Sequence, residues 1–238
     1  MSSFSLLDLA AVAVFLVAWI GYSVAVEGSA RRRPSLNGMM DRYRHAWADQ
    51  LIVRENRVVD TTINASLQNG TAFFASTSLI ALGSVLTLTR SADDVLTLFA
   101  TLPFGTQTTR TTWEIKVAGL ALIFVYAFFK FAWAYRLFNY GAILIGAVPP
   151  RGGDPEAIAR AARRAAAMNV VAGGHFNRGQ RAFFFALAYL GWFVSAYVLF
   201  VTTVAVLTVM WHRQFASDAR RALKDNDDPP DTDDRRDP

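Results

Sequence analysis

The 238-residue chain contains no cysteine. This absence excludes disulfides, thiolate metal sites and cysteine nucleophiles, and it leaves the redox compartment undetermined. The three histidines, His45, His175 and His212, lack the HExxH or i,i+4 spacing of a catalytic zinc site. No G-x-S-x-G, Walker or Rossmann motif occurs either. The sequence therefore predicts no metal, no cofactor and no recognisable catalytic centre.

Charge is also scarce. Charged residues make up only 18% of the chain and gather between apolar segments, whereas hydrophobic residues make up 53%. The segment 182–211 contains thirty consecutive residues without a charge, and about 20 apolar residues suffice to cross the hydrocarbon core of a bilayer. A soluble domain would interleave charged and apolar residues. The composition therefore predicts an all-α integral membrane protein.

Four apolar segments predict four transmembrane helices in a single membrane domain, residues 1–224. We expect these spans at about residues 6–26, 70–89, 114–136 and 183–211. The first has no Lys or Arg before it and is too long for a signal peptide, so we expect a retained helix. Residues 225–238 are mostly Asp, Pro and Arg, and a disordered acidic tail is expected there.

The two longer loops carry helix signals. Between the first two spans, Asn37 to Gln68 places Met40, Tyr43, Trp47, Leu51 and Val58 on one stripe at 100° per residue, which predicts an amphipathic cytoplasmic helix. This helix either lies on the membrane surface, where it could gate a path, or packs on the ends of the spans. Arg54 falls within the apolar stripe and needs a carbonyl, carboxylate or phosphate partner.

Helix boundaries can be expected at three further positions. In the second long loop, Asp154 and Pro155 form an N-cap followed by a proline at the first helical position. We expect Gly173 and Gly174 to end the short helix that follows. Thr111 and Glu114 have the spacing of a capping box at the start of the third span.

The distribution of basic residues predicts the orientation. Residues 27–69 contain seven Lys and Arg and residues 139–181 contain six, against eight on the other side when the tail is included. Basic loops resist translocation. We therefore expect both loops in the cytoplasm and both termini in the periplasm of a bacterial inner membrane. The net charge of +5 then reflects this bias and contact with anionic lipid headgroups rather than binding of nucleic acid.

Ionisable residues within a span are costly and usually face the protein interior or water. Lys130 and Arg136 lie on the cytoplasmic half of the third span. They are the starting point of a candidate site for an anion or a lipid phosphate, completed by Arg54, Ser76, Thr77, Ser78, His175, Arg178 and Arg181. The competing interpretation is that Lys130 and Arg136 extend their side chains to the headgroup layer.

Three segments resemble a known family. They are RENRVVD at Arg54 to Asp60, NGTAFFASTS at Asn69 to Ser78, and HFNRGQRAFFF at His175 to Phe185. The chain resembles a family of small bacterial multi-pass membrane proteins, with plant relatives, that is catalogued only as a domain of unknown function. The resemblance implies a helical four-span fold, and it implies no activity, substrate or catalytic residue.

Three functions fit this sequence. The first is a non-enzymatic component that forms an oligomer or a complex with other membrane proteins, because the second and third spans are polar enough to favour protein neighbours. The second is a small anion channel or transporter with a cationic cytoplasmic vestibule. The third is a lipid-modifying enzyme, for which His175 and Asp60 are the candidate bases.

Overall fold

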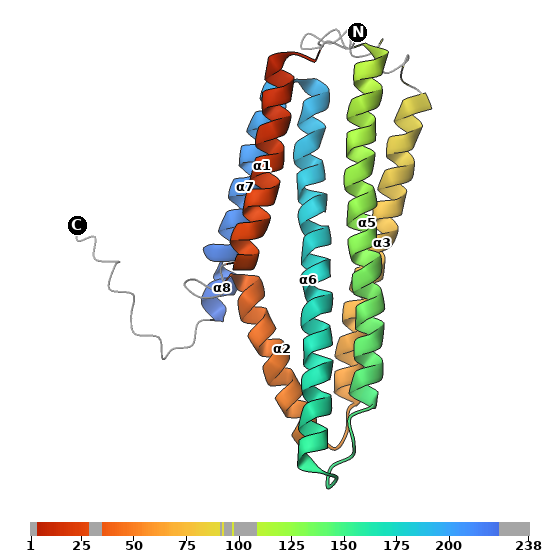
Figure 1. The fold of residues 1–238 in the computed structure, drawn as a ribbon, viewed down its shortest axis with the longest axis vertical. Coiled ribbons are helices and arrows are strands. Elements are labelled where there is room, and N and C mark those ends of the chain that lie inside the picture. Colours follow the sequence, from red (N-terminus) through yellow and green to blue (C-terminus); the bar gives the residue numbers. More distant parts are fainter. Residues whose placement is uncertain (1–3, 29–34, 91, 93–96, 98–108, 224–238) are drawn as a thin grey trace, which may run out of the picture.

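The computed structural model describes residues 4–28, 35–90, 92, 97 and 109–223. Within these residues the secondary structure is helical, as the sequence predicts (Figure 1). The helices are α1 (Leu6–Gly28), α2 (Leu36–Val53), α3 (Val58–Arg90), α5 (Arg110–Gly146), α6 (Pro155–Val194), α7 (Ala196–Phe215) and α8 (Asp218–Ala222). The tail predicted over residues 225–238 lies outside the described residues.

Four helical segments are long and apolar enough to cross a membrane. They are Leu6–Gly28, Val58–Arg90, Arg110–Gly146 and Ala196–Ala222. The first three contain the segments expected at 6–26, 70–89 and 114–136. The fold class predicted from the sequence, a helical membrane protein with four such segments, is confirmed.

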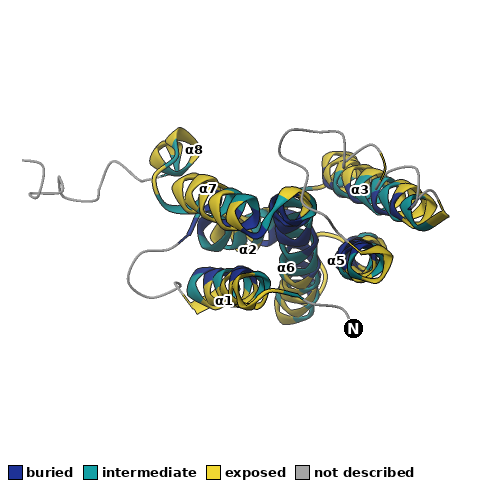
Figure 2. Ribbon diagram, turned by 90° about the horizontal axis from the view of Figure 1, so that it is seen from above, coloured by how far each residue is buried: buried dark blue, intermediate teal, exposed yellow. Residues whose placement is uncertain are grey.

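The long helices α5 and α6 run side by side along the length of the molecule, and α3 lies against α5 at one edge (Figures 1 and 2). At the other edge, α1 and α7 pack beside the upper half of α6. The helix α2 continues below α1 and packs along the lower half of α6. The largest core cluster lies in the upper half and is aromatic, with Trp19 stacked on Phe185 at 5.4 Å between ring centroids.

The fourth span expected at 183–211 is wrong in one respect, because these residues do not form one helix. The chain turns at Ser195, whose backbone is extended at φ −166° and ψ 165°. Its N–H donates to the carbonyl of Gly191 at the end of α6, and its hydroxyl accepts from the N–H of Val198 at the start of α7. The Thr202 hydroxyl donates to the Ala188 carbonyl at 2.8 Å. The two helices therefore form an antiparallel hairpin, which the absence of charge could not reveal.

The end of α6 at this turn is stabilised by a lysine that sequence reasoning missed. Lys116 of α5 is 4% exposed, and its ammonium donates to the Trp192 carbonyl at 2.7 Å. The Trp192 indole in turn donates to Asp8 of α1 at 2.9 Å. A cation beside the last carbonyls of a helix complements the negative end of its dipole. A buried charge from another helix thus stabilises the point at which the chain reverses.

The hairpin also changes the relation between the two ends of the chain. The Tyr22 hydroxyl near the end of α1 donates to the Met210 carbonyl near the end of α7, at 3.1 Å. The N–H of Asn37 at the start of α2 donates to Gln214 at 3.3 Å. The end of α7 therefore lies beside the end of α1, away from Asp8. This arrangement arises because the turn at Ser195 reverses the chain once more.

The helix expected over 37–68 is divided. It ends at Val53, and α3 begins at Val58 after Arg54 adopts an extended backbone. The first part, α2, packs on α6 and buries Met39, Ala48 and Leu51, which favours the packed interpretation over a helix lying on the membrane surface. Of the residues on the predicted stripe, Leu51 is buried, whereas Met40, Tyr43 and Val58 are exposed.

Two other expected boundaries are wrong and one is confirmed. The helix does not end at Gly173 and Gly174, because α6 continues to Val194, and the missing side chain of Gly173 leaves room for the Arg44 guanidinium. The N-cap of α5 is Thr109 rather than Thr111, since its hydroxyl accepts from Thr112. Asp154 caps α6 as expected by accepting from the N–H groups of residues 156 and 157.

Replacing Gly191 by alanine tests the hairpin. A Cβ at Gly191 would lie 2.5 Å from the Thr202 hydroxyl oxygen and 3.0 Å from the backbone of Val198. We expect Gly191→Ala to lower the free energy of unfolding by about 1–3 kcal/mol through overpacking, measured by denaturant unfolding in detergent micelles. In one continuous helix the same change would instead raise it by about 1 kcal/mol.

The matched control is Gly70→Ala in α3, where a Cβ meets nothing within 4 Å. We expect this variant to be neutral or more stable by up to about 1 kcal/mol, from helix propensity alone. Equal stabilisation by both substitutions would contradict the hairpin.

Candidate functional site

The two cations predicted within the third span do not point into a shared vestibule. Arg136 is exposed on α5, where its Nε donates to the Tyr140 hydroxyl at 2.6 Å and its guanidinium lies 6.0 Å from the Trp133 ring centroid. The Lys130 ammonium lies 5.1 Å from the Tyr126 ring centroid. Both side chains pack on aromatic neighbours of their own helix, in the manner of residues that extend to the headgroup layer.

The predicted hydroxyl donors are also occupied or directed elsewhere. Thr77 and Ser78 donate to the carbonyls of Phe73 and Phe74, each at 2.8 Å. Ser76 is exposed on the outer side of α3. Among the hydrogen bonds of the described residues, none joins these three hydroxyls to a basic side chain.

Arg178 and Arg181 are brought together, and they share a carboxylate that the sequence analysis did not single out. Arg178 forms a bidentate pair with Glu27 of α1, with nitrogen–oxygen distances of 3.0 and 2.9 Å. Arg181, whose side chain is 7% exposed, pairs with the same carboxylate. Bidentate arginine–carboxylate pairs are among the stronger ionic contacts in proteins. Glu27 therefore joins the end of α1 to the middle of α6.

Two adjoining cavities surround this ion cluster. The larger has a volume of about 430 Å³ and lies among α1, α2 and α6, with Glu27, Asp41 and Arg178 in its wall. The smaller has a volume of about 190 Å³ and extends to α7, with Tyr22, Gln180 and Arg213 in its wall. Asn37, Asn177 and Arg181 line both cavities. The arrangement is a polar hollow at the level where α1 and α7 end.

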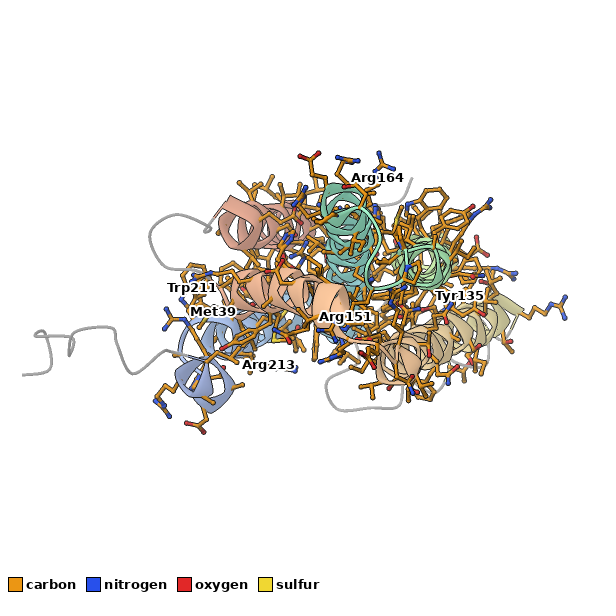
Figure 3. All side chains as sticks on the ribbon, turned by 90° about the horizontal axis from the view of Figure 1, so that it is seen from below. Met39, Tyr135, Arg151, Arg164, Trp211 and Arg213 are labelled. Carbon is orange, nitrogen blue, oxygen red and sulfur yellow. The ribbon has the colours of Figure 1, made fainter. Side chains whose placement is uncertain are left out.

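Arg213 is a cation of this hollow that sequence reasoning missed. Its guanidinium lies 5.3 Å from the ring centroid of Phe184, and it makes no ion pair within the described part of the chain. Figure 3 shows Arg213 on the α7 side of the molecule, opposite Tyr135 of α5. Hydropathy alone could not identify it, because it lies just beyond the uncharged run.

His175 lies on α6, where its ring faces Trp133 of α5. Its Nδ1 is buried and has no hydrogen-bond partner among the described residues, and its ring meets Trp133 edge-on at 6.5 Å between centroids. Burial, followed by the charges of Lys130 and Arg178, lowers the pKa of His175.

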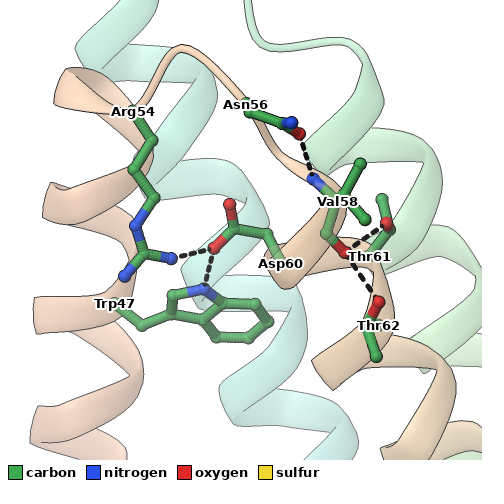
Figure 4. A network of polar contacts seen from close by, with 7 residues as sticks. All are labelled: Trp47, Arg54, Asn56, Val58, Asp60, Thr61 and Thr62. Atoms are coloured by element: carbon green, nitrogen blue, oxygen red, sulfur yellow. Dashed lines mark hydrogen bonds and ion pairs between the residues drawn. The ribbon is translucent and has the colours of Figure 1, made fainter.

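Arg54 and Asp60 form a separate network at the lower end of the molecule (Figure 4). One oxygen of Asp60, which is fully buried, accepts from Arg54 at 2.6 Å and from the Trp47 indole at 2.6 Å. The partner required for Arg54 is thus a carboxylate. No described hydrogen bond joins Asp60 to His175, the other candidate base. This network connects the end of α2 to the start of α3.

The chain belongs to the family described as Protein of unknown function, DUF599, whose model matches residues 10–219. This match confirms the family resemblance seen in three segments of the sequence. No curated protein and no solved structure matches the chain.

The Arg54–Asp60 pair can be tested by removing its arginine. We expect Arg54→Gln to decrease the free energy of unfolding by about 3 kcal/mol. This is the lower end of the range for breaking a buried ion pair, and the loss arises because the buried carboxylate is left without its cation. Unfolding in detergent micelles measures the loss.

The matched control is Arg151→Gln. Arg151 pairs with Glu55 at 3.0 Å, but the two side chains are 64% and 78% exposed, so this loss should be at most about 1 kcal/mol. Similar losses in the two variants would show that burial of Asp60 adds nothing to the pair.

Proposed function

We propose that this protein is a non-enzymatic, multi-pass component of the bacterial inner membrane that assembles with further copies of itself through the outer face of α3. The observation that carries the proposal is a stripe of small and polar residues on that face. Asn69, Ser76 and Gly83 recur at seven-residue spacing, and all three are exposed. Residues seven apart lie on one side of a helix. Small residues at such spacing allow two helices in a bilayer to approach closely.

Ser76 strengthens this argument. Most hydroxyls of the upper part of α3 donate to a carbonyl one turn earlier, for example Ser84 to Ile80 and Thr87 to Gly83, each at 3.0 Å. The Ser76 hydroxyl has no such partner within the described residues. A hydroxyl without a hydrogen bond is disfavoured in hydrocarbon, so a neighbouring helix would suit this position better than lipid.

The place of α3 in the bundle supports the same proposal. It lies at the edge and packs mainly against α5, so its outer face is exposed (Figure 2). Only 17% of the apolar window of α3 is buried, compared with 44% for α5. The helix thus has most of its surface available to a neighbour within the membrane.

We further propose an orientation in which α1 begins in the periplasm and α7 ends in the cytoplasm. The parallel arrangement of α1 and α7 supports this orientation, with the upper half of α6 as an additional crossing between them. The cytoplasmic side would then carry seven Lys and Arg in residues 27–69, six in residues 139–181 and six from Arg213 onward. Only Arg90 and Arg110 would lie outside, which fits the positive-inside rule better than two periplasmic termini.

The anion-channel alternative receives less support. A conducting vestibule needs cations that are available to the ion. Arg178 and Arg181 already share Glu27, and Arg136 is exposed on α5 beside Tyr140. The lipid-enzyme alternative would need a base near a bound substrate, and Asp60 is already engaged by Arg54 and Trp47.

Cysteine cross-linking tests the assembly, and the cysteine-free chain makes this experiment simple. We expect Ser76→Cys and Gly83→Cys to give a covalent dimer on mild oxidation of native membranes, because both positions would face the same position of a second copy. The control is Leu122→Cys, which is 69% exposed on α5 and should remain monomeric. Equal dimer formation at Leu122, or none on α3, would contradict the proposal. A product of another mass would indicate a different membrane protein on the same face.

Reporter fusions test the orientation. A reporter that is active only in the cytoplasm should work when fused after Pro238 and when inserted at Gly152, and it should be silent at the N-terminus. A reporter that is silent after Pro238 but active at Gly152 would contradict this orientation. It would indicate an even number of membrane crossings, with both ends of the chain in the periplasm.

A further inference from the structure

We infer that the two adjoining cavities among α1, α2, α6 and α7 form a binding site for the phosphate of an anionic phospholipid headgroup. The inference goes beyond assembly through α3, which lies elsewhere in the bundle (Figure 1). It depends on three features of the cavities: their position, their charge and their free donors.

The position suits an amphiphile. The smaller cavity is lined on one side by Tyr22, Phe184 and Met210 of the membrane-embedded bundle. Its other side is formed by polar residues of α2, α6 and α7, including Asn37, Gln180 and Gln214. A free anion would use only the polar side. A phospholipid has a headgroup for the polar wall and acyl chains for the apolar one.

The charge of the cavities is incompletely balanced. Three guanidinium groups line them, those of Arg178, Arg181 and Arg213. Glu27 balances one of these charges while contacting two of the arginines. The other carboxylate in the wall, Asp41, is paired with Arg44 at 2.5 Å. An excess of positive charge at the end of a membrane helix on the basic side of a protein attracts anionic lipid.

The free donors match the oxygens of a phosphate. Arg213 contacts the Phe184 ring but no carboxylate within the described residues. The side-chain amides of Asn177 and Gln180, which line the cavity one helical turn apart, make no hydrogen bond to any described residue. Guanidinium and amide N–H groups together supply the charge-assisted hydrogen bonds that phosphate oxygens accept.

Native mass spectrometry of the purified full chain tests this site. The protein is mixed in detergent with phosphatidylglycerol or with phosphatidylcholine, and the retained lipid is counted. We expect preferential retention of phosphatidylglycerol and an affinity about tenfold lower in Arg213→Gln, equivalent to about 1.4 kcal/mol, because this variant loses one charge-assisted hydrogen bond. Asn177→Leu should also weaken retention while every charge remains in place.

The matched control is Arg136→Gln, which removes the same charge from an exposed position on the α5 side of the bundle and should leave retention unchanged. Thermal unfolding without added lipid shows whether each variant keeps its fold. If Arg213→Gln does not fold, the result for Asn177→Leu decides the test. If Arg136→Gln and Arg213→Gln lose retained phosphatidylglycerol equally, the site is overturned, because the lipid is then attracted by the overall positive charge of the protein. Displacement of the lipid by millimolar inorganic phosphate would overturn the lipid as the ligand and indicate a free anion. Equal retention of the two lipids would overturn the inference altogether.

Discussion

The turn at Ser195 is the constraint on which the arrangement of the molecule depends. It reverses the chain within a run of thirty uncharged residues, so that α7 returns along α6 and reaches the end of α1. Without this reversal, Arg213 and Gln214 would lie far from Asn37 and the polar hollow would lack one wall. The turn is possible because Gly191 permits close contact between the helices and because Lys116 partners a carbonyl at the end of α6.

α6 is joined to α1 by polar contacts at two levels. Trp192 contacts Asp8 near the turn, and Arg178 and Arg181 contact Glu27 about three to four helical turns away. Between these levels, Phe15 packs against Phe185 and Tyr189. Apolar contacts between helices in a bilayer give little directional preference, since lipid tails are equally apolar. The two polar connections therefore help to define the position of α1 along α6.

The candidate site was only partly predictable from the sequence. Arg178 and Arg181 were expected to complete a site around Lys130 and Arg136, and the structure brings both arginines to one cavity. Lys130 and Arg136 were identified because ionisable residues within a span are costly, yet they pack on Tyr126 and Tyr140 of their own helix. Glu27 and Arg213 received no attention, because a charge at the end of a span is ordinary until its neighbours are known. The position of a charged residue in the sequence indicates that placing it in a span is energetically unfavourable, but it does not identify the residue that pairs with it.

The amino-acid sequence was enough to predict the class of molecule, which is an all-helical chain with four long apolar segments, three of them at the expected places. It was also enough to predict the family. These properties are sums over neighbouring residues, since hydropathy and helix capping depend on local composition. Packing in three dimensions sets where the uncharged run is interrupted, where the 37–68 helix is divided, and which end of the bundle α7 reaches. Each of these depends on contacts between residues far apart in the chain, such as Lys116 with Trp192 and Asn37 with Gln214. No local pattern records such contacts, because helix packing selects them after the helices have formed.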